Sequence, residues 1–321
     1  AGRTRVALAA GVLVAGLLVT TAPGPFCEES LSLEAEIYAT LGHALDERGR
    51  PDDAVAAYRK ALEVDPGLEQ VHYNLGKLLS ERGDLESAAA AYRRAVELDP
   101  SFAGAHLNLG SLQMRLGRPD AAVESFRAAA WSDPGMAAAQ RNLAGALLAV
   151  GRPEEALAAV QAADALEPGR PEHHALRGGA LLQQGDPAAA VAELQQALQT
   201  GRDDALLRLD LGTALLGLGQ PEQALDHFDR AASMDPGLAR AHGNAGVALA
   251  MLGRLEEATR RLQQAVALEP GFVDARVNLA RVLARRGDLQ AARGQLEEAA
   301  RTAPDSPELR RMLSALDAAP R

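Results

Sequence analysis

The chain has 321 residues, of which 3% are aromatic and 24% are charged, and its formal net charge at pH 7 is −10. So few aromatic side chains argue against a large compact core, and the abundance of Ala, Leu, Glu, Gln and Arg, all strong helix formers, predicts an all-α protein. The acidic balance, with basic residues interleaved among acids, argues against a nucleic-acid partner, because phosphate binding needs clustered Lys and Arg.

The first feature along the chain is an apolar segment close to the N-terminus. Arg3 and Arg5 precede residues 6–22, which carry no charge. As a helix this run measures about 26 Å, slightly less than the roughly 30 Å hydrocarbon core of a bilayer. Residues 1–22 are therefore expected to form a hydrophobic helix that acts as a signal peptide or a membrane anchor.

The residues that follow bear on whether this segment is cleaved. A proline follows each possible cleavage point, Ala22 and Gly24, and Phe26 precedes Cys27 where bacterial lipoproteins carry a small residue. We therefore expect an uncleaved anchor through residues 6–22, with the rest of the chain on the extracytoplasmic, periplasmic side. Secretion after cleavage, or a lipid anchor on Cys27, are the alternatives.

Two ladders of residues with one period run through the rest of the chain. Glycines recur every 34 residues, at Gly49, Gly83, Gly117, Gly151, Gly185, Gly219, Gly253 and Gly287. Prolines keep the same spacing, at Pro66, Pro100, Pro134, Pro168, Pro236, Pro270 and Pro304. The period predicts eight 34-residue repeats over residues 35–306, preceded by a linker over 23–34.

Each repeat is predicted to be a helical hairpin, as the second one illustrates. Residues 69–82 form its helix A, Gly83 and Asp84 make the turn, and residues 85–98 form its helix B. Glycine suits the turn because it adopts positive φ without a Cβ clash. The proline after Asp99 ends helix B because it lacks an N–H.

Apolar and small residues share one face of each predicted helix. In the second repeat these are Leu75, Gly76 and Leu79 in helix A, and Ala88, Tyr92 and Ala95 in helix B. Their spacings of three and four residues place them on one side of a helix. The small residues let the two helices approach closely, and the large ones fill the space between repeats.

This pattern resembles the tetratricopeptide repeat. The first repeat carries nearly the whole signature, Tyr38, Leu41, Gly42, Ala54, Tyr58, Ala61 and Pro66. The third and sixth repeats match as well, with Leu109, Gly110, Phe126 and Pro134, and with Leu211, Gly212, Phe228 and Pro236. The resemblance implies an α-solenoid, a right-handed superhelix of antiparallel hairpins whose A helices line a concave groove that binds peptides or proteins.

The fifth repeat departs from the pattern, and the last one is followed by a cap. Arg177 stands where leucine is expected, and residues 200–202 replace the usual acidic residue and proline, so we expect an irregular joint at residues 200–204. Residues 307–321 are predicted to form a capping helix, because Ser306 can cap its start and Leu309, Leu313 and Leu316 give it an apolar face.

If the resemblance holds, helix A positions facing the groove form the binding site. One end is acidic, and the first repeat places Glu36, His43, Asp46 and Glu47 there. The middle is apolar, with Leu107, Met114, Leu148, Leu182, Leu206, Leu209, Leu216, Val247 and Met251. The other end is basic, with Arg281 and Arg285, and Arg240 and Arg276 nearby. Such a stripe suits an amphipathic helix or an extended apolar segment.

A ladder of asparagines accompanies these positions. Equivalent helix A sites hold Asn74, Asn108, Asn142, Asn244 and Asn278, with Asp210 at the same site in the sixth repeat. An amide both donates and accepts, so the ladder can bind a peptide backbone of any sequence. In this it resembles the repeat domain of O-linked N-acetylglucosamine transferases. The clamp of Lys, Asn and Arg that holds C-terminal carboxylates in co-chaperones is absent from the first two repeats.

No pattern indicates catalysis. His72, His106, His174 and His242 occupy one repeat position, so their spacing is too wide for a shared zinc ion, and the adjacent His173 and His174 point to different faces. Phosphate-binding loops, nucleophile elbows and metalloprotease motifs are missing. We therefore expect no enzyme, no metal or other cofactor, and no small-molecule substrate.

The sequence thus predicts a membrane-tethered scaffold or assembly factor that binds a protein partner in its groove. The alternative is the substrate-recruiting part of a larger enzyme such as a glycosyltransferase. The capping helix favours the scaffold.

Overall fold

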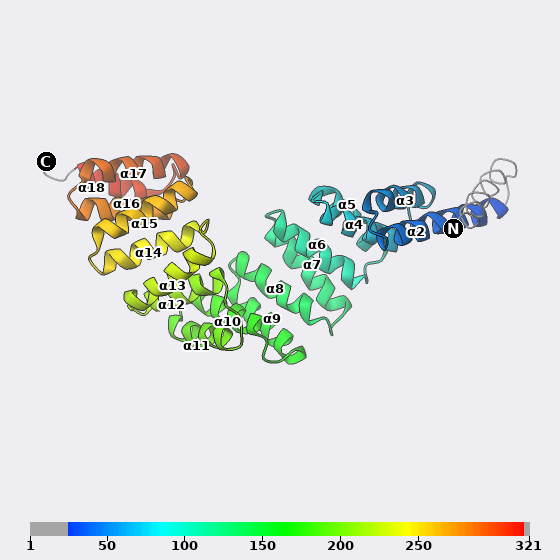
Figure 1. The fold of residues 1–321 in the computed structure, drawn as a ribbon, viewed down its shortest axis with the longest axis horizontal. Coiled ribbons are helices and arrows are strands. Elements are labelled where there is room, and N and C mark those ends of the chain that lie inside the picture. The colour runs from blue at the N-terminus through cyan, green and yellow to red at the C-terminus, as the bar shows by residue number, and fades with distance from the viewer. Residues whose placement is uncertain (1–24, 318–321) are drawn as a thin grey trace. The chain divides into compact units, whose positions relative to one another are not determined.

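The computed structural model describes residues 25–317, with side chains from residue 31 to residue 316. These residues form 17 α-helices and no strands, so the predicted all-α class is confirmed (Figure 1). The anchor predicted at residues 6–22 lies outside the described residues. In the part that is described, no helix combines the length and the apolar character needed to cross a membrane.

The chain divides into two compact units, Ala1–Val150 and Gly151–Arg321. The helices described in the first unit are α2 (Pro25–Asp46), α3 (Pro51–Val64), α4 (Glu69–Glu81), α5 (Leu85–Leu98), α6 (Ala103–Arg115), α7 (Pro119–Ser132) and α8 (Ala137–Ala149). The second unit holds α9 (Pro153–Leu166), α10 (Pro171–Gln183), α11 (Pro187–Gln199), α12 (Ala205–Gly217), α13 (Pro221–Met234), α14 (Ala239–Met251), α15 (Leu255–Leu268), α16 (Val273–Arg285), α17 (Leu289–Thr302) and α18 (Pro307–Asp317).

Even-numbered helices from α2 to α16 are the A helices of the repeats, and odd-numbered helices from α3 to α17 are the B helices. Inside each unit an A helix packs on its own B helix, as α4 does on α5 and α12 on α13, and that B helix packs on the next A helix. This stacking of hairpins is the predicted solenoid. One boundary differs from the prediction: α2 begins at Pro25, so residues 25–34, expected as part of a linker, continue into the first repeat as one helix.

Helix α18, Pro307–Asp317, lies within the capping helix predicted at residues 307–321, of which residues 318–321 lie outside the described part of the chain. Helix α18 packs on α17. The backbone N–H of Leu309 donates to Ser306 Oγ at 3.4 Å, and Leu309 is buried, with Leu313 and Leu316 packed against the same core. An apolar inner face and a charged outer face close the stack at this end.

The glycine ladder ends the A helices. In the second repeat, Gly83 has φ of +81° and directly follows Arg82, the C-cap residue of α4. Its N–H donates to Ser80 O at 3.1 Å, and Asp84 N donates to Leu79 O at 2.9 Å, which satisfies the last carbonyls of α4. Every member of the ladder has φ between +67° and +86°, so each turn needs a residue without Cβ.

Aspartates close the loops between repeats. Asp65, Asp133 and Asp235 each precede a Pro-Gly pair, and each Oδ1 accepts a hydrogen bond from the glycine N–H, at 2.8, 3.0 and 3.0 Å. The side chain thus imitates a backbone turn while the proline blocks continuation of the B helix. These residues explain why the proline ladder has an acidic neighbour.

A second set of glycines allows the A and B helices to approach. In the sixth repeat a Cβ on Gly212 of α12 would lie 2.6 Å from Phe228 Cε1 and 3.1 Å from the backbone oxygen of Ala224, both on α13. Gly42 and Gly110 have the same relation to Tyr58 and Phe126 in the first and third repeats. The aromatic ring therefore occupies the space that a side chain on the A helix would need.

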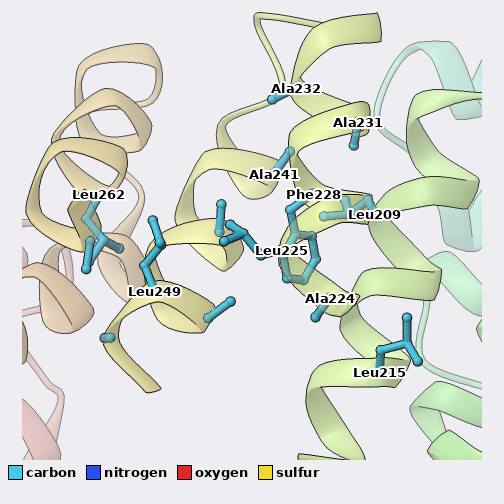
Figure 2. Packing of buried hydrophobic residues seen from close by; sticks show 14 of the residues in the cluster. Leu209, Leu215, Ala224, Leu225, Phe228, Ala231, Ala232, Ala241, Leu249 and Leu262 are labelled. Atoms are coloured by element: carbon cyan, nitrogen blue, oxygen red, sulfur yellow. The ribbon is translucent and has the colours of Figure 1, made fainter. Parts of the chain in front are cut away.

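The core of the second unit is built from such contacts and from alanine. Figure 2 shows Phe228 beside Ala224 and Leu225 of α13, with Leu209 and Leu215 from α12 and Leu249 from α14 around them. The first unit has its own core around Tyr58, Leu78 and Tyr92. Small residues at the helix crossings and few large ones between them explain how a chain with so few aromatic residues still buries its interior.

The fifth repeat is irregular, as predicted. Helix α11 ends at Gln199, and Gly201 has φ of +106°, outside the range of the ladder. Arg202 Nε lies 2.6 Å from Asp204 Oδ2, and Arg208 donates to both carboxylate oxygens of Asp203 at 2.7 Å. Ion pairs thus replace the proline that ends the other repeats.

Arg177, which stands where the repeat pattern has leucine, belongs to an ionic cluster. Its Nε lies 3.1 Å from Glu193 Oε2 on α11, and its guanidinium lies 3.6 Å from Asp164 Oδ2 on α9. Each of the two adjacent histidines contacts one of the carboxylates that bind Arg177. The fully buried His173 lies 3.1 Å from Asp164, and His174 lies 2.7 Å from Glu193. The prediction that these two histidines face different ways is confirmed.

We predict that Gly212→Ala destabilises the second unit by about 1–2 kcal/mol, because the new methyl group must displace Phe228 or the backbone of α13. Gly294→Ala is the matched control: Gly294 lies inside α17 with no atom within 4 Å of an added Cβ. That change should stabilise by roughly 0.5–1 kcal/mol, because alanine favours a helix interior. Urea unfolding followed by circular dichroism measures both. Equal effects of the two substitutions would contradict the close-contact explanation.

Candidate functional site

From α4 to α8 and from α10 to α16, the A helices of successive repeats contact one another and so form one layer inside each unit. In the second unit α10 contacts α12, α12 contacts α14, and α14 contacts α16, and in the first unit α4 contacts α6 and α6 contacts α8. The B helices lie on the other side of this layer, because each packs on its own A helix and on the next. We call the side of the A helices turned away from the B helices the A-helix surface.

All the predicted site residues lie on A helices, but their exposure differs. Leu206 and Met251 are the most open apolar ones, with 54% and 53% of their surface exposed. Arg281 and Arg285 are also exposed. The half-buried residues are Asn74, Leu107, Asn108, Met114, Asn142, Leu148, Leu182, Asp210, Leu216, Asn244, Val247 and Asn278. Of these, Leu107, Leu182 and Leu216 also pack against core clusters, so only part of each side chain faces outward.

The prediction that Leu209 lines the groove is wrong. Its exposed fraction is 0%, and it packs in the core of the second unit beside Phe228 (Figure 2). Helix α12 carries leucine on nearly every side, so periodicity alone did not separate leucines that face neighbouring helices from those that face solvent. Leu206, three residues earlier, is the exposed leucine of this helix.

Two members of the asparagine ladder are tied to the preceding repeat. Asn108 Nδ2 donates to the hydroxyl of Tyr73 at 3.2 Å, and Asn244 Nδ2 donates to Thr213 Oγ1 at 3.2 Å. Asn74 Oδ1 accepts from Gln70 Nε2 at 3.1 Å. In Asn108 and Asn244 the amide nitrogen is therefore engaged between repeats, and the oxygen is the atom that remains to meet a ligand N–H.

Asp210 takes the asparagine position in the sixth repeat and differs from the amides in its electrostatics. It lies among the half-buried residues of α12. Burial raises its pKa to about 6, while the nearby Arg240 and Arg202 act in the opposite direction. A carboxyl group in this environment resists ionisation, because removing the charged form from water costs free energy. A neutral amide of the same shape has no such cost.

The predicted basic end is partly neutralised by the chain itself. Arg281 donates to Glu308 Oε1 of α18 at 2.9 Å, and Arg285 donates to the backbone oxygen of Ala250 at 2.8 Å. Both guanidinium groups therefore help to hold neighbouring elements together. Arg285 fastens α16 to the end of α14, and Arg281 fastens it to the cap.

In each unit a pocket opens on the A-helix surface. The pocket of the first unit has a volume of about 570 Å³ and lies between α2 and α4, where Asn74, His43 and Glu47 line it. The pocket of the second unit, of about 620 Å³, is polar and lies between α14, α16 and α18, where Asn244, Asn278 and Arg281 line it. Three of the predicted asparagines thus border cavities of the size that holds a ligand.

Sequence reasoning missed the loop residues of these pockets. Leu68 and Phe272, at the N-cap positions of α4 and α16, line the first and second pocket respectively. Glu69 and Gln70, in the first turn of α4, also line the first pocket. The repeat period carried the signal, because an apolar residue stands at the equivalent place in several repeats, at positions 68, 102, 136, 238 and 272.

The recurring histidines have a structural task that the sequence did not reveal. His72, His106 and His242 each place Nε2 at 3.1, 3.1 and 3.3 Å from the carbonyl oxygen of the proline six residues earlier. In the eighth repeat Arg276 donates to Pro270 O at 3.0 Å from the same position. These side chains tie the inter-repeat loop to the following A helix. Among the described residues no group of His, Cys, Asp and Glu is arranged to hold a metal ion.

The chain's similarity to known families and structures follows the repeats. A family model described as "Tetratricopeptide repeat" matches residues 39–103 and 73–137. A second model with the same description matches residues 116–178, 181–245, 215–267 and 249–316. No curated protein sequence matches the chain.

Among solved structures, a chain of the APC/C hetero-tetramer Cut9–Hcn1 is 20% identical with a TM-score of 0.68, and the match covers 90% of this chain and 59% of that chain. This chain therefore spans less than two thirds of that relative. A tetratricopeptide repeat protein from Parabacteroides merdae is 17% identical with a TM-score of 0.62, over 78% and 98% of the two chains. PilF of Pseudomonas aeruginosa is 26% identical with a TM-score of 0.52, over 64% and 94%.

We predict that Asp210→Asn stabilises the second unit in a pH-dependent way. The pKa of Asp210 in the fold, about 6, is above its ordinary value of 3.8, so ionisation opposes folding. The cost of ionisation to folding is absent at a pH where Asp210 is protonated in both the folded and the unfolded state. It grows as the pH rises from 3.8 to about 6, and it reaches its full size above that pH. The gain should be on the order of 2–3 kcal/mol near pH 8 and close to zero near pH 3.5.

Urea unfolding at the two pH values measures this gain. Asp226→Asn, at an exposed aspartate of α13, is the control for a general effect of removing one negative charge. A gain for Asp210→Asn that does not change with pH would show that the carboxyl group is not desolvated in the fold.

Proposed function

Because the chain belongs to the tetratricopeptide repeat family, we propose that it is a protein-interaction scaffold that binds a peptide or helical segment of a partner protein on its A-helix surface. Proteins of this family are typically non-enzymatic scaffolds, and their domains generally bind protein or peptide partners. From α4 to α8 and from α10 to α16 the A helices contact one another, so that positions repeated along the sequence become neighbours on one face. A partner segment can meet several repeats at once on such a face.

The observation that carries the proposal is the exposure of large apolar side chains on this surface. Leu206 and Met251 have more than half of their surface open to solvent, although each lies on a helix whose other sides are packed. Half-buried Val247 and Leu216 lie on the same two helices. Apolar side chains gathered on one face typically mark a surface that a partner covers.

Polar groups of the same surface supply the orientation. The half-buried oxygens of Asn108 and Asn244 are fixed by hydrogen bonds of their amide nitrogens to the preceding repeat. An acceptor fixed in this way loses little entropy when it meets a backbone N–H of the ligand. Apolar contacts would thus supply affinity, and the amides would hold the partner's backbone in register.

We predict that a photo-crosslinking amino acid at position 206 captures a discrete partner protein in the native host. Leu206 is the right position because it is exposed, whereas Leu209 is buried. Gln199, exposed on the B helix α11 of the same unit, is the control position. A single adduct from position 206 and none from position 199 is the expected outcome. Equal capture at both positions, or at neither, would count against binding on the A-helix surface.

The same proposal includes tethering to a membrane. Residues 6–22 are uncharged and follow Arg3 and Arg5, as in an N-terminal anchor with the repeats on the periplasmic side. We predict that the full chain sediments with membranes of the native host and that deletion of residues 6–22 releases it. Cell fractionation with detection of the repeats measures both. Recovery of the intact chain in the cytoplasm would contradict the anchor.

A further inference from the structure

The pocket of the first unit has a wall whose full charges are all of one sign. Glu47 follows the end of α2, and Glu69 begins α4, and both line the pocket. No lysine or arginine is among the residues that line it. The nearby Lys77 has its ammonium group 3.8 Å from Asp46 and is paired with that carboxylate. The two glutamates therefore face the cavity without a lysine or arginine in its wall.

The only potential counter-charge in the wall is weakly held. His43 Nδ1 lies 3.7 Å from Glu47 Oε1, and both side chains are mostly exposed to solvent. An ion pair of this kind contributes little, because water screens it and two mobile side chains must be held together. A cation from a partner can therefore take the place of His43 beside Glu47.

The floor of the pocket is apolar. Ala39 and Ala44 of α2, Leu68, and Val71 of α4 surround it, with the ring of Tyr58 beneath. Burial raises the pKa of the Tyr58 hydroxyl, and the negative charges of Asp46 and Glu47 raise it further, which places this end of the unit in a negative field. A hydrogen bond links the hydroxyl to Asn74, another residue of the wall.

We propose that this pocket selects a lysine or arginine side chain of the bound partner segment. The aliphatic stem lies against Ala39, Ala44 and Tyr58, and the cationic end reaches the carboxylates of Glu47 and Glu69. Long basic side chains combine an apolar stem with a charged tip, which matches a cavity with an apolar floor and an acidic rim. The inference rests on the proposed binding of a peptide segment and specifies its chemistry at the first two repeats.

The pocket of the second unit shows that this charge preference is local. Arg240 and Arg281 line it together with Asp274 and Glu308, so acids and bases balance, and Arg281 already contacts Glu308 at 2.9 Å. Such a wall favours neither sign of charge. A requirement for a basic residue therefore belongs to the pocket of the first unit.

Selection of random peptides displayed on phage, with the full chain as target, tests the inference without a known partner. The expected outcome is enrichment of peptides with lysine or arginine beside an apolar residue. The best of these, made synthetically with a fluorescent label, should bind Glu47→Gln or Glu69→Gln about tenfold more weakly, as expected for the loss of one charge-assisted contact. Replacing the peptide's basic residue by norleucine, which keeps the stem and removes the charge, should weaken binding to the wild type similarly.

Glu81→Gln is the matched control, because Glu81 is exposed at the other end of α4 and does not line the pocket. It removes the same charge from the same helix and should leave affinity unchanged. Circular dichroism confirms that each variant is folded.

Two results would overturn the inference, and they differ in what they say of the proposed function. The basic-residue inference is overturned if the selected peptides lack a basic residue, or if they bind Glu47→Gln and Glu69→Gln as tightly as the wild type. If Leu206→Lys weakens the binding of these peptides, the proposed function still stands. Failure of the full chain to select any peptide overturns both proposals.

Discussion

In six repeats the A and B helices approach each other at a glycine, at positions 42, 76, 110, 178, 212 and 246. In the first, third and sixth repeats the ring of Tyr58, Phe126 or Phe228 lies where a side chain on the A helix would otherwise be. The same relation joins Gly178 to Leu194 and Gly246 to Leu262, where leucine replaces the aromatic ring. One large side chain on the B helix against a bare backbone on the A helix sets the distance within the hairpin. The alanines that surround it, such as Ala224 and Ala231, then fill the remaining space without forcing the helices apart.

The binding surface follows from this arrangement. Each B helix packs on one side of its own A helix, so each A helix keeps one face that its own repeat does not cover. Contacts between successive A helices join these faces within a unit. Polar groups at the junctions, such as the Asn108–Tyr73 and Asn244–Thr213 pairs, hold neighbouring repeats in register and at the same time leave amide oxygens available. The same asparagines thus hold neighbouring repeats together and present an oxygen that can accept a hydrogen bond from a ligand.

The sequence predicted the helices more fully than the site. The helices of the second repeat, expected at 69–82 and 85–98, are observed at Glu69–Glu81 and Leu85–Leu98, because the glycine and proline ladders fix helix ends through local backbone geometry. The placement of leucines was harder. Leu206 and Leu209 are three residues apart on one A helix, yet one is exposed and the other has no exposed surface. That difference is set by the packing of α13 and α14, which a helical period does not contain.

The pockets were beyond sequence reasoning for a related reason. Glu69 and Gln70 meet Ala39 and His43 only because the start of one A helix lies beside the middle of the previous one. The ionic cluster around Arg177 has the same origin: its partners Asp164 and Glu193 come from helices on either side in the chain. The sequence pattern predicted that the fifth repeat is unusual. Only the packing of the helices shows which carboxylates pair with the arginine that stands in place of leucine.

The reach of the contacts along the chain has a further consequence. Inside each unit the extensive contacts join a helix to its immediate neighbour or to the next but one, so residues that touch are seldom separated by much more than one period of sequence. Such a topology has low contact order, and chain closure costs little entropy before a native contact forms. Folding can begin at any hairpin and spread to both sides, and it can do so while later repeats are still being synthesised. By the same property, insertion or loss of one whole period changes the length of an array and leaves the pairing rules of the remaining helices intact.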